Sequence, residues 1–187
     1  IGLHLGGLVD HRDDLGVDEA VRGRCGGVLR SDGIGHETPL NAPYPNPLLV
    51  TRAWHVVQPL DVDAMRTATS ALLGEHDFSA FRGAGCQARS PVRRLERLVV
   101  SRTADYLHIE VRANGFLYHM VRNIVGALVR VGSGEAEPGW LAELLAGRDR
   151  RRGAPTAPAQ GLYFAEVHYP AGLELPSPAP RPVWRDR

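Results

Sequence analysis

Residues 107–126 read LHIEVRANGFLYHMVRNIVG, and two periodicities meet within them. In residues 107–111 apolar and polar side chains alternate, which predicts a half-buried strand. After the turn dipeptide Asn114-Gly115, the apolar residues recur with the spacing of a helix. The stretch therefore predicts a strand, a tight turn and then a helix that ends at Gly132-Ser133-Gly134.

The predicted helix is apolar around most of its circumference and carries a single polar stripe. At about 100° per residue, the stripe is about 100° wide. Its members are His119, Arg122, Asn123, Gly126 and Arg130. The apolar remainder consists of Leu117, Met120, Val121, Ile124, Leu128 and Val131. We therefore expect a mostly buried helix with Arg122 at the centre of its polar stripe.

Two interpretations of Arg122 stay open. Helix statistics alone favour an arginine on a solvated outer face. In the alternative, the stripe lines a cleft, where a guanidinium that cannot lose its proton needs a carboxylate or phosphate partner. Gly126 lies one turn beyond Arg122 and destabilises a helix unless another group must approach closely there. This glycine favours the second interpretation.

The segment before this stretch predicts a helix and a compact loop. Asp61 is the expected N-cap, and Gly74 is the expected end of the helix. The predicted buried face consists of Val62, Met65, Thr69, Leu72 and Leu73. Phe78 and Phe81 are expected to anchor the following loop in the core.

The remaining pattern indicates one more hairpin, one more helix and a last strand. Residues 92–100 and 106–112 predict two strands joined by a turn at 103–105. Residues 138–147 predict a helix, with Pro138 in its first turn and an apolar face of Trp140, Leu141, Leu144 and Leu145. Residues 161–168 predict a final strand. Because strands and helices do not alternate regularly, we predict an α+β fold: an antiparallel sheet with helices packed on one face.

Charge is distributed unevenly along the 187 residues. The net charge is only +1, and all 22 basic residues other than histidine are arginines. Six arginines lie between residues 82 and 102, and four lie between residues 148 and 152. Such runs suit a phosphate backbone, but they also suit a solvated strand edge that charge protects from aggregation. Both interpretations stay open.

The cysteine content and the hydropathy of the sequence indicate the cellular compartment in which the protein is expected. Two cysteines, Cys25 and Cys86, cannot form a disulfide framework, so a reducing cytoplasm is expected. No apolar run is long enough to span a bilayer, and no signal-peptide pattern is present. Cys86 has no histidine or cysteine at metal-binding spacing, so we expect it to be structural and expect no metal site.

Several linked motifs occur in order from about Asn46 to the C-terminus. They include residues 54–55 (WH), 59–61 (PLD), 74–82 (GEHDFSAFR), 86–93 (CQARSPVR), 113–126 (ANGFLYHMVRNIVG), 149–150 (DR) and 154–163 (APTAPAQGLY). Together they resemble the bacterial tRNA pseudouridine synthase A family.

The resemblance implies a domain organisation and a function. Residues 46–170 would form the C-terminal α/β domain of the family, residues 1–45 a Gly/Pro-rich N-terminal remnant, and residues 171–187 a Pro-rich tail. The implied activity is isomerisation of uridine to pseudouridine in the tRNA anticodon stem-loop, at nucleotides 38–40. The implied protein is a cytoplasmic homodimer that binds tRNA and needs no metal or organic cofactor.

The resemblance also implies roles for individual residues. Arg122 would hold a catalytic aspartate ionised and correctly oriented. Leu162 would pack beside the uracil pocket, although an ordinary inward position on a strand is an equally good interpretation. Asn123, His119 and Arg82 are the further residues assigned to substrate binding.

The match is poorest at the nucleophile. The family carries its aspartate in an Arg-Thr-Asp-x-Gly-Val-His-Ala motif, and residues 30–37 (RSDGIGHE) are the nearest stretch. Asp32 is therefore the candidate nucleophile, although it lies only 22 positions before Trp54. The family's Tyr-Arg-Tyr segment is expected where this chain has residues 35–37 (GHE). Two functions follow: a tRNA pseudouridine synthase, or a catalytically inactive RNA-binding or dimerisation module derived from that family.

Overall fold

A long hairpin forms the middle of the sheet. A computed structural model describes residues 32–168, without the side chains of residues 32–34, 36 and 166–168. The hairpin consists of β5 (Val92–Thr103) and β6 (Tyr106–Ala113), which pair from Leu95 to Thr103 on β5. Ala104 turns the chain between them with φ 50°. The strands predicted at 92–100 and 106–112 are confirmed, and β5 is three residues longer than expected.

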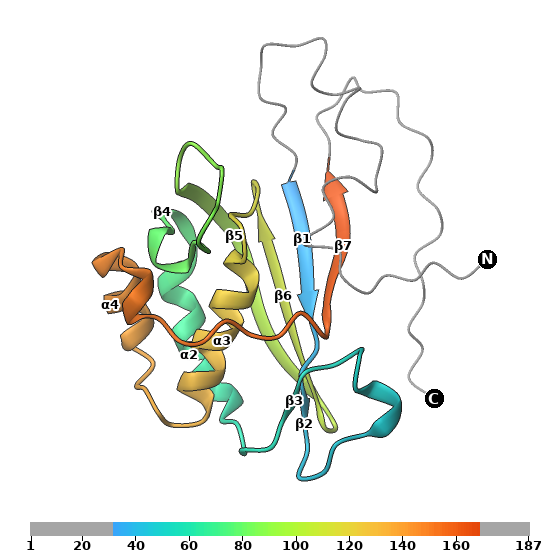
Figure 1. Ribbon diagram of the computed structural model, residues 1–187. Coiled ribbons are helices and arrows are strands. Elements are labelled where there is room, and N and C mark those ends of the chain that lie inside the picture. The colour runs from blue at the N-terminus through green and yellow to red at the C-terminus, as the bar shows by residue number, and fades with distance from the viewer. Residues whose placement is uncertain (1–31, 169–187) are drawn as a thin grey trace, which may run out of the picture.

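Five shorter strands complete the sheet on either side of the hairpin (Figure 1). They are β1 (Asp32–Glu37), β2 (Leu40–Asn41), β3 (His55–Val56), β4 (Gly74–Asp77) and β7 (Leu162–His168). β4 pairs with β5, while β1 lies between β6 and β7. Every pairing is antiparallel except that of the two-residue strands β2 and β3, which are parallel. The predicted antiparallel sheet is thus confirmed apart from this short pair.

Three α-helices cover one face of the sheet (Figure 1). They are α2 (Val62–Thr69), α3 (Met120–Gly132) and α4 (Trp140–Gly147). Short 3-10 helices span Pro47–Leu49, Ser70–Leu72, Ser79–Phe81 and Arg150–Arg152. On β6, the residues Leu107, Ile109, Val111 and Ala113 are completely buried. The alternation read from the sequence therefore places every second side chain of β6 in the core beneath the helices.

The central helix α3 begins later than its periodicity predicts. His119 is its N-cap and has the left-handed φ of 58°, so Leu117 and His119 precede the helix. From Met120 onward the predicted apolar positions are buried, including Ile124 and Leu128 at 0% exposure. The helix ends at Gly132, as predicted.

Helix α2 is capped as its sequence predicts. The Oδ1 atom of Asp61 accepts hydrogen bonds from the backbone N–H groups of Asp63 (2.9 Å) and Ala64 (3.0 Å). Met65 and Leu72 are fully buried, but Leu73 is 42% exposed, so its predicted place in the core is wrong. The reason is that the chain leaves the helix through a 3-10 turn, and Leu73 is already extended as it enters β4.

The other predicted anchors lie in the core. Phe78 and Phe81 are 0% and 1% exposed. Leu141, Leu144 and Leu145 form the buried face of α4, which starts two residues after Pro138. Trp140 is half-buried, and the guanidinium of Arg130 lies 4.9 Å from the centre of its ring.

β1 comes from the segment in which the sequence shows no strand period. Gly35 pairs with Val111 of β6 and Phe164 of β7. Two residues further on, Glu37 is 0% exposed. Since a glycine and a glutamate occupy these positions, no apolar alternation marks the strand. The sheet therefore includes a strand that lies before the boundary expected at residue 46.

Three expectations concern parts of the chain outside the described residues: the fold of residues 1–31, the Pro-rich tail and the role of Cys25. Within residues 32–168, no helix has both the length and the apolar character needed to cross a membrane.

Candidate active site around Arg122

The segment that leads to β7 crosses α3 (Figure 1). This segment, residues 153–161, is called the strap here. A Cβ atom on Gly126 would lie 2.1 Å from the carbonyl oxygen of Pro155. The N–H of Ala157 donates to the carbonyl of Arg122 at 3.1 Å. The glycine in the stripe thus marks a close approach, as its unfavourable helix propensity predicts.

Arg122 is half-buried and engaged on two sides. Its Nε donates to the carbonyl oxygen of Ala157 at 2.7 Å. Its Nη1 lies 3.1 Å from Nε2 of His119. Because a guanidinium can only donate, this contact requires an unprotonated Nε2 on His119. The interpretation of Arg122 as a freely solvated surface arginine therefore does not describe this side chain.

His119 is held by its backbone and by its neighbour. A left-handed φ is uncommon for a residue other than glycine. The imidazole stacks on the ring of Tyr118, with a centroid separation of 3.8 Å. The N–H of Gly83 donates to the carbonyl of Tyr118 at 2.8 Å, which ties this turn to the loop after β4. The N-terminal end of α3 is thereby fixed against a second element.

A carboxyl group that the sequence did not single out interacts with Arg122. Glu37 is 0% exposed, and neither of its carboxyl oxygens has a hydrogen-bond partner among the described residues. Burial raises the pKa of Glu37 from 4.5 to about 8, although the positive charge of Arg122 opposes this rise. Sequence reasoning missed Glu37 because only the pairing of β1 with two distant strands buries it.

Asn123 uses its amide inside the protein. Its Nδ2 donates to the carbonyl of Phe81 at 2.7 Å. Its Oδ1 accepts from Nη2 of Arg150 (3.0 Å) and from the hydroxyl of Thr156 (2.7 Å). Burial lowers the pKa of Arg150 below its ordinary value. These bonds join α3 to the 3-10 helix Ser79–Phe81 and to the strap.

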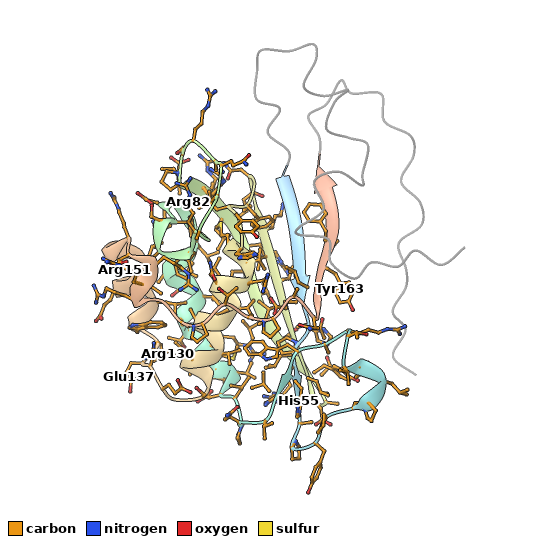
Figure 2. All side chains as sticks on the ribbon, viewed as in Figure 1. His55, Arg82, Arg130, Glu137, Arg151 and Tyr163 are labelled. Atoms are coloured by element: carbon orange, nitrogen blue, oxygen red, sulfur yellow. The ribbon has the colours of Figure 1, made fainter. Side chains whose placement is uncertain are left out.

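Arg82 closes the loop between β4 and β5, near the upper end of the molecule in Figure 2. Its Nη2 donates to the carbonyls of Cys86 and Ala88, each at 2.7 Å. The Sγ atom of Cys86 accepts from the N–H of Tyr118 at 3.4 Å. Although burial acts to raise the pKa of Cys86, hydrogen bonds from Tyr118, Ala88 and Arg82 lower it overall. Both side chains therefore support the loop that lies against the start of α3.

Leu162 and Asp32 lie at opposite ends of the same pair of strands. Leu162 pairs with Glu37 and packs, half-buried, against the core. Asp32 pairs with His168, and its side chain is outside the described part. At about 3.3 Å per residue, Asp32 is roughly 16 Å along β1 from Glu37. Leu162 is thus a cross-strand neighbour of Glu37, whose carboxyl group interacts electrostatically with Arg122, whereas the backbone of Asp32 lies further along β1.

Many arginines of the two basic runs are already paired. Arg94 contacts Glu75 at 3.5 Å, Arg97 contacts Glu110 at 2.7 Å, and Arg151 contacts Asp149 at 2.9 Å. Arg151 is nevertheless highly exposed, on the α4 side of the molecule in Figure 2. Exposed ion pairs of this kind contribute little to stability, so a phosphate can compete for them. No three His, Cys, Asp or Glu side chains gather as a metal site within the described part of the chain.

The fold and the site together define an α+β protein with a half-buried arginine held at the start of its central helix. The sequence profile of the family described as tRNA pseudouridine synthase matches residues 68–170, and the chain belongs to that family.

The relatives that the chain resembles are tRNA pseudouridine synthases A. It is 56% identical to that of Thiobacillus denitrificans over 128 residues, which are 68% of this chain and 49% of the relative. It is 50% identical to that of Paraburkholderia phymatum over 136 residues, 73% of this chain and 51% of the relative. It is 52% identical to that of Burkholderia multivorans over 134 residues, which are 72% of this chain and 50% of the relative. The chain thus spans about half the length of the curated relatives it matches.

Proposed function

We propose that this chain takes part in the isomerisation of uridine to pseudouridine in the anticodon stem-loop of tRNA. The observation that carries this proposal is the guanidinium of Arg122, which lies within the region matched to the family and is held by Ala157 and His119. A fixed, permanently charged donor can orient a carboxylate or a phosphate, which the isomerisation of a nucleotide in RNA requires.

The proposed chemistry needs a carboxylate nucleophile or base and a flipped nucleotide. The bond between N1 of uracil and C1′ of ribose breaks, and the base rotates. C5 then bonds to C1′ and loses its proton, while N1 gains one, so the product is an isomer of the substrate. The target base must leave its stack to reach the reacting groups. Asp32 is the proposed nucleophile, Arg122 its orienting partner, and Leu162 an apolar contact for the base. This chemistry needs no metal or organic cofactor.

The exposed arginines suit the RNA backbone. Each phosphate that they neutralise adds affinity that falls as the salt concentration rises. Arg89, Arg151 and Arg152 are exposed members of the two basic runs. The proposal extends to a homodimer that acts on tRNA in the cytoplasm.

A second function is favoured by the carboxyl group beside Arg122. Within the described part of the chain, the carboxyl group that acts electrostatically on Arg122 is that of Glu37, and it is completely buried. A buried carboxyl cannot touch a substrate. This observation favours an inactive module that binds RNA or forms dimers and keeps the arginine site without a nucleophile.

Isomerisation and binding should be measured in parallel on anticodon stem-loop RNAs with uridine at positions 38, 39 or 40. Arg122→Gln is expected to reduce turnover by about a hundredfold or more, because it removes a fixed charge from the reaction site. Arg130→Gln, on the same helix, is the matched control and should stay within a few fold of the wild type.

The outcomes separate the two functions. Loss of turnover in Asp32→Ala with binding retained would support the enzyme and its proposed nucleophile. Binding without any pseudouridine formation by the wild-type chain would support the inactive module. Absence of both activities would contradict the enzyme and the RNA-binding module, and would leave only a module that forms dimers.

A further inference from the structure

Glu37 differs from every other buried polar residue of the described region. The others are Asn41, Thr69 and Asn123, and each of them is hydrogen-bonded. Glu37 is ionisable and fully buried, yet both of its carboxyl oxygens lack a partner within residues 32–168. A buried polar group without a hydrogen bond destabilises a protein, so such a group needs an explanation.

The position of Glu37 on β1 places it between apolar strands and the start of α3. A Cβ atom on Gly35 would lie 3.7 Å from Cγ2 of Val121, so this side of β1 faces α3. Glu37, two residues further on, occupies the same side of the strand. Its cross-strand partners are Ile109 on β6 and Leu162 on β7, which offer no charge. The charged group that acts on Glu37 is Arg122 of α3.

We propose that Glu37 is a positioning residue for Arg122. While Glu37 holds a proton, the guanidinium keeps its contacts with Ala157 and His119; when the proton leaves, the carboxylate draws the guanidinium away from them. Glu37 itself touches no substrate, because it is completely buried. It acts through the direction in which Arg122 donates its hydrogen bonds.

The physical argument rests on the charge balance at the site. An ionised carboxylate in apolar surroundings is unfavourable unless it is paired and hydrogen-bonded. Arg122 carries five N–H donors and a permanent charge, so a turn of its side chain toward the carboxylate would supply both hydrogen bonds and a compensating charge. The raised pKa of Glu37, about 8, places the change within the pH range in which RNA-modifying activity can be measured.

One consequence rests on the proposed function. As the pH rises through about 8, the part of turnover or RNA binding that depends on Arg122 should fall, because the guanidinium turns away. Glu37→Gln should remove this fall, since an amide does not ionise. The other group in contact with the guanidinium is His119, whose Nε2 must be unprotonated to accept.

The protonation claim can be tested without any activity. Carboxyl carbon resonances of the full chain labelled with ¹³C-glutamate should be followed by NMR from pH 4 to pH 10. One resonance should titrate well above all the others, and it should be missing in Glu37→Gln. In Arg122→Gln the midpoint of that resonance should rise further, while in Arg130→Gln it should not move. Ordinary midpoints for every glutamate, or an unchanged midpoint in Arg122→Gln, would overturn the proposal.

A second measurement covers the case in which Arg122→Gln does not fold. The ¹⁵Nε resonance of Arg122 should shift in the wild type with the same midpoint as Glu37, and it should stay fixed in Glu37→Gln. An Arg122 ¹⁵Nε resonance that does not shift when Glu37 titrates would contradict the positioning role. If both resonances behave as expected but the chain forms no pseudouridine, the positioning role stands and the proposed activity fails. If the chain is active and Glu37→Gln keeps the pH profile of the wild type, the functional consequence of the positioning role is contradicted.

Discussion

At the scale of single residues, two positions show how the strap and the sheet constrain side chains. Gly126 leaves room for the carbonyl of Pro155, and Glu37 keeps an ionisable group in the core. The first could be predicted from the sequence, because a glycine within a helical period stands out. The second could not, because the burial of Glu37 depends on two strands distant in sequence.

Replacing Gly126 with alanine should displace the strap. The new Cβ atom would lie 2.1 Å from the carbonyl oxygen of Pro155, so the backbone must move. We expect a loss of about 1–3 kcal/mol in the free energy of unfolding, measured by urea denaturation. Gly139→Ala is the control, because nothing lies within 4 Å of its Cβ position and its φ of −63° suits alanine. Equal stabilities for the two variants would contradict this account of the close approach.

The stability of the protein should depend on pH through Glu37. In the folded state its pKa is raised from 4.5 to about 8, so between these values the folded chain holds a proton that the unfolded chain releases. The stabilisation that comes from this bound proton is therefore fully present below about pH 4.5 and is lost as the pH rises to about 8. The loss is at most about 5 kcal/mol by proton linkage.

Urea denaturation at several pH values checks this expectation. The unfolding free energy of the wild type should fall between pH 5 and pH 8 more steeply than that of Glu37→Gln. Glu37→Leu should be more stable than the wild type at pH 8, because it removes an unpaired buried group. Parallel pH dependences for the wild type and Glu37→Gln would be inconsistent with a buried carboxyl group.

At the scale of secondary-structure elements, local signals decide most boundaries. The N-cap of α2, the turn before β6 and the apolar periods of β6 and α3 are each contained in fewer than twenty consecutive residues, and all were predictable. The start of α3 was not predictable. The apolar spacing of the helix extends back to Leu117, but the left-handed backbone of His119 makes the helix begin at Met120. Leu73 was placed wrongly for a similar reason, since a 3-10 turn ends the helical period early.

Removing the cap of α2 should destabilise the chain measurably. Asp61→Ala leaves the N–H groups of Asp63 and Ala64 without their side-chain acceptor. The expected loss is about 1 kcal/mol in the free energy of unfolding. Asp61→Asn retains an acceptor oxygen and should lie within a few tenths of a kcal/mol of the wild type. A loss of the same size in both variants would point to charge and not to capping.

At the scale of the whole molecule, the sheet depends on a strand that local pattern does not reveal. The α+β class and the helix-covered face followed from periodicity, and the candidate site followed from one arginine and a family likeness. The pairing of β1 with β6 and β7 could not be predicted, because Gly35 and Glu37 lack the apolar alternation of a central strand. The carboxyl group beside Arg122 was missed for the same reason.

A chain shortened to begin at Asn46 tests whether β1 is part of the folded unit. This truncation removes β2 together with β1. The strands β6 and β7 then lose their shared neighbour, and β6 also loses its short pairing with β2, so backbone groups lose hydrogen-bond partners. We expect the shortened chain to lack the cooperative thermal transition of the full chain, as monitored by circular dichroism. A transition of equal sharpness and midpoint would show that residues 46–170 fold independently of β1.

The position of β1 also has a consequence for synthesis on the ribosome. Gly35 is made well before its partners Val111 and Phe164. Pairings of such long range slow folding and leave strand edges open while they wait. The nascent chain can form the β5–β6 hairpin with the helices first, but it completes the sheet only when its last strand has left the exit tunnel. Until then β1 must be kept from pairing with the strands of other chains.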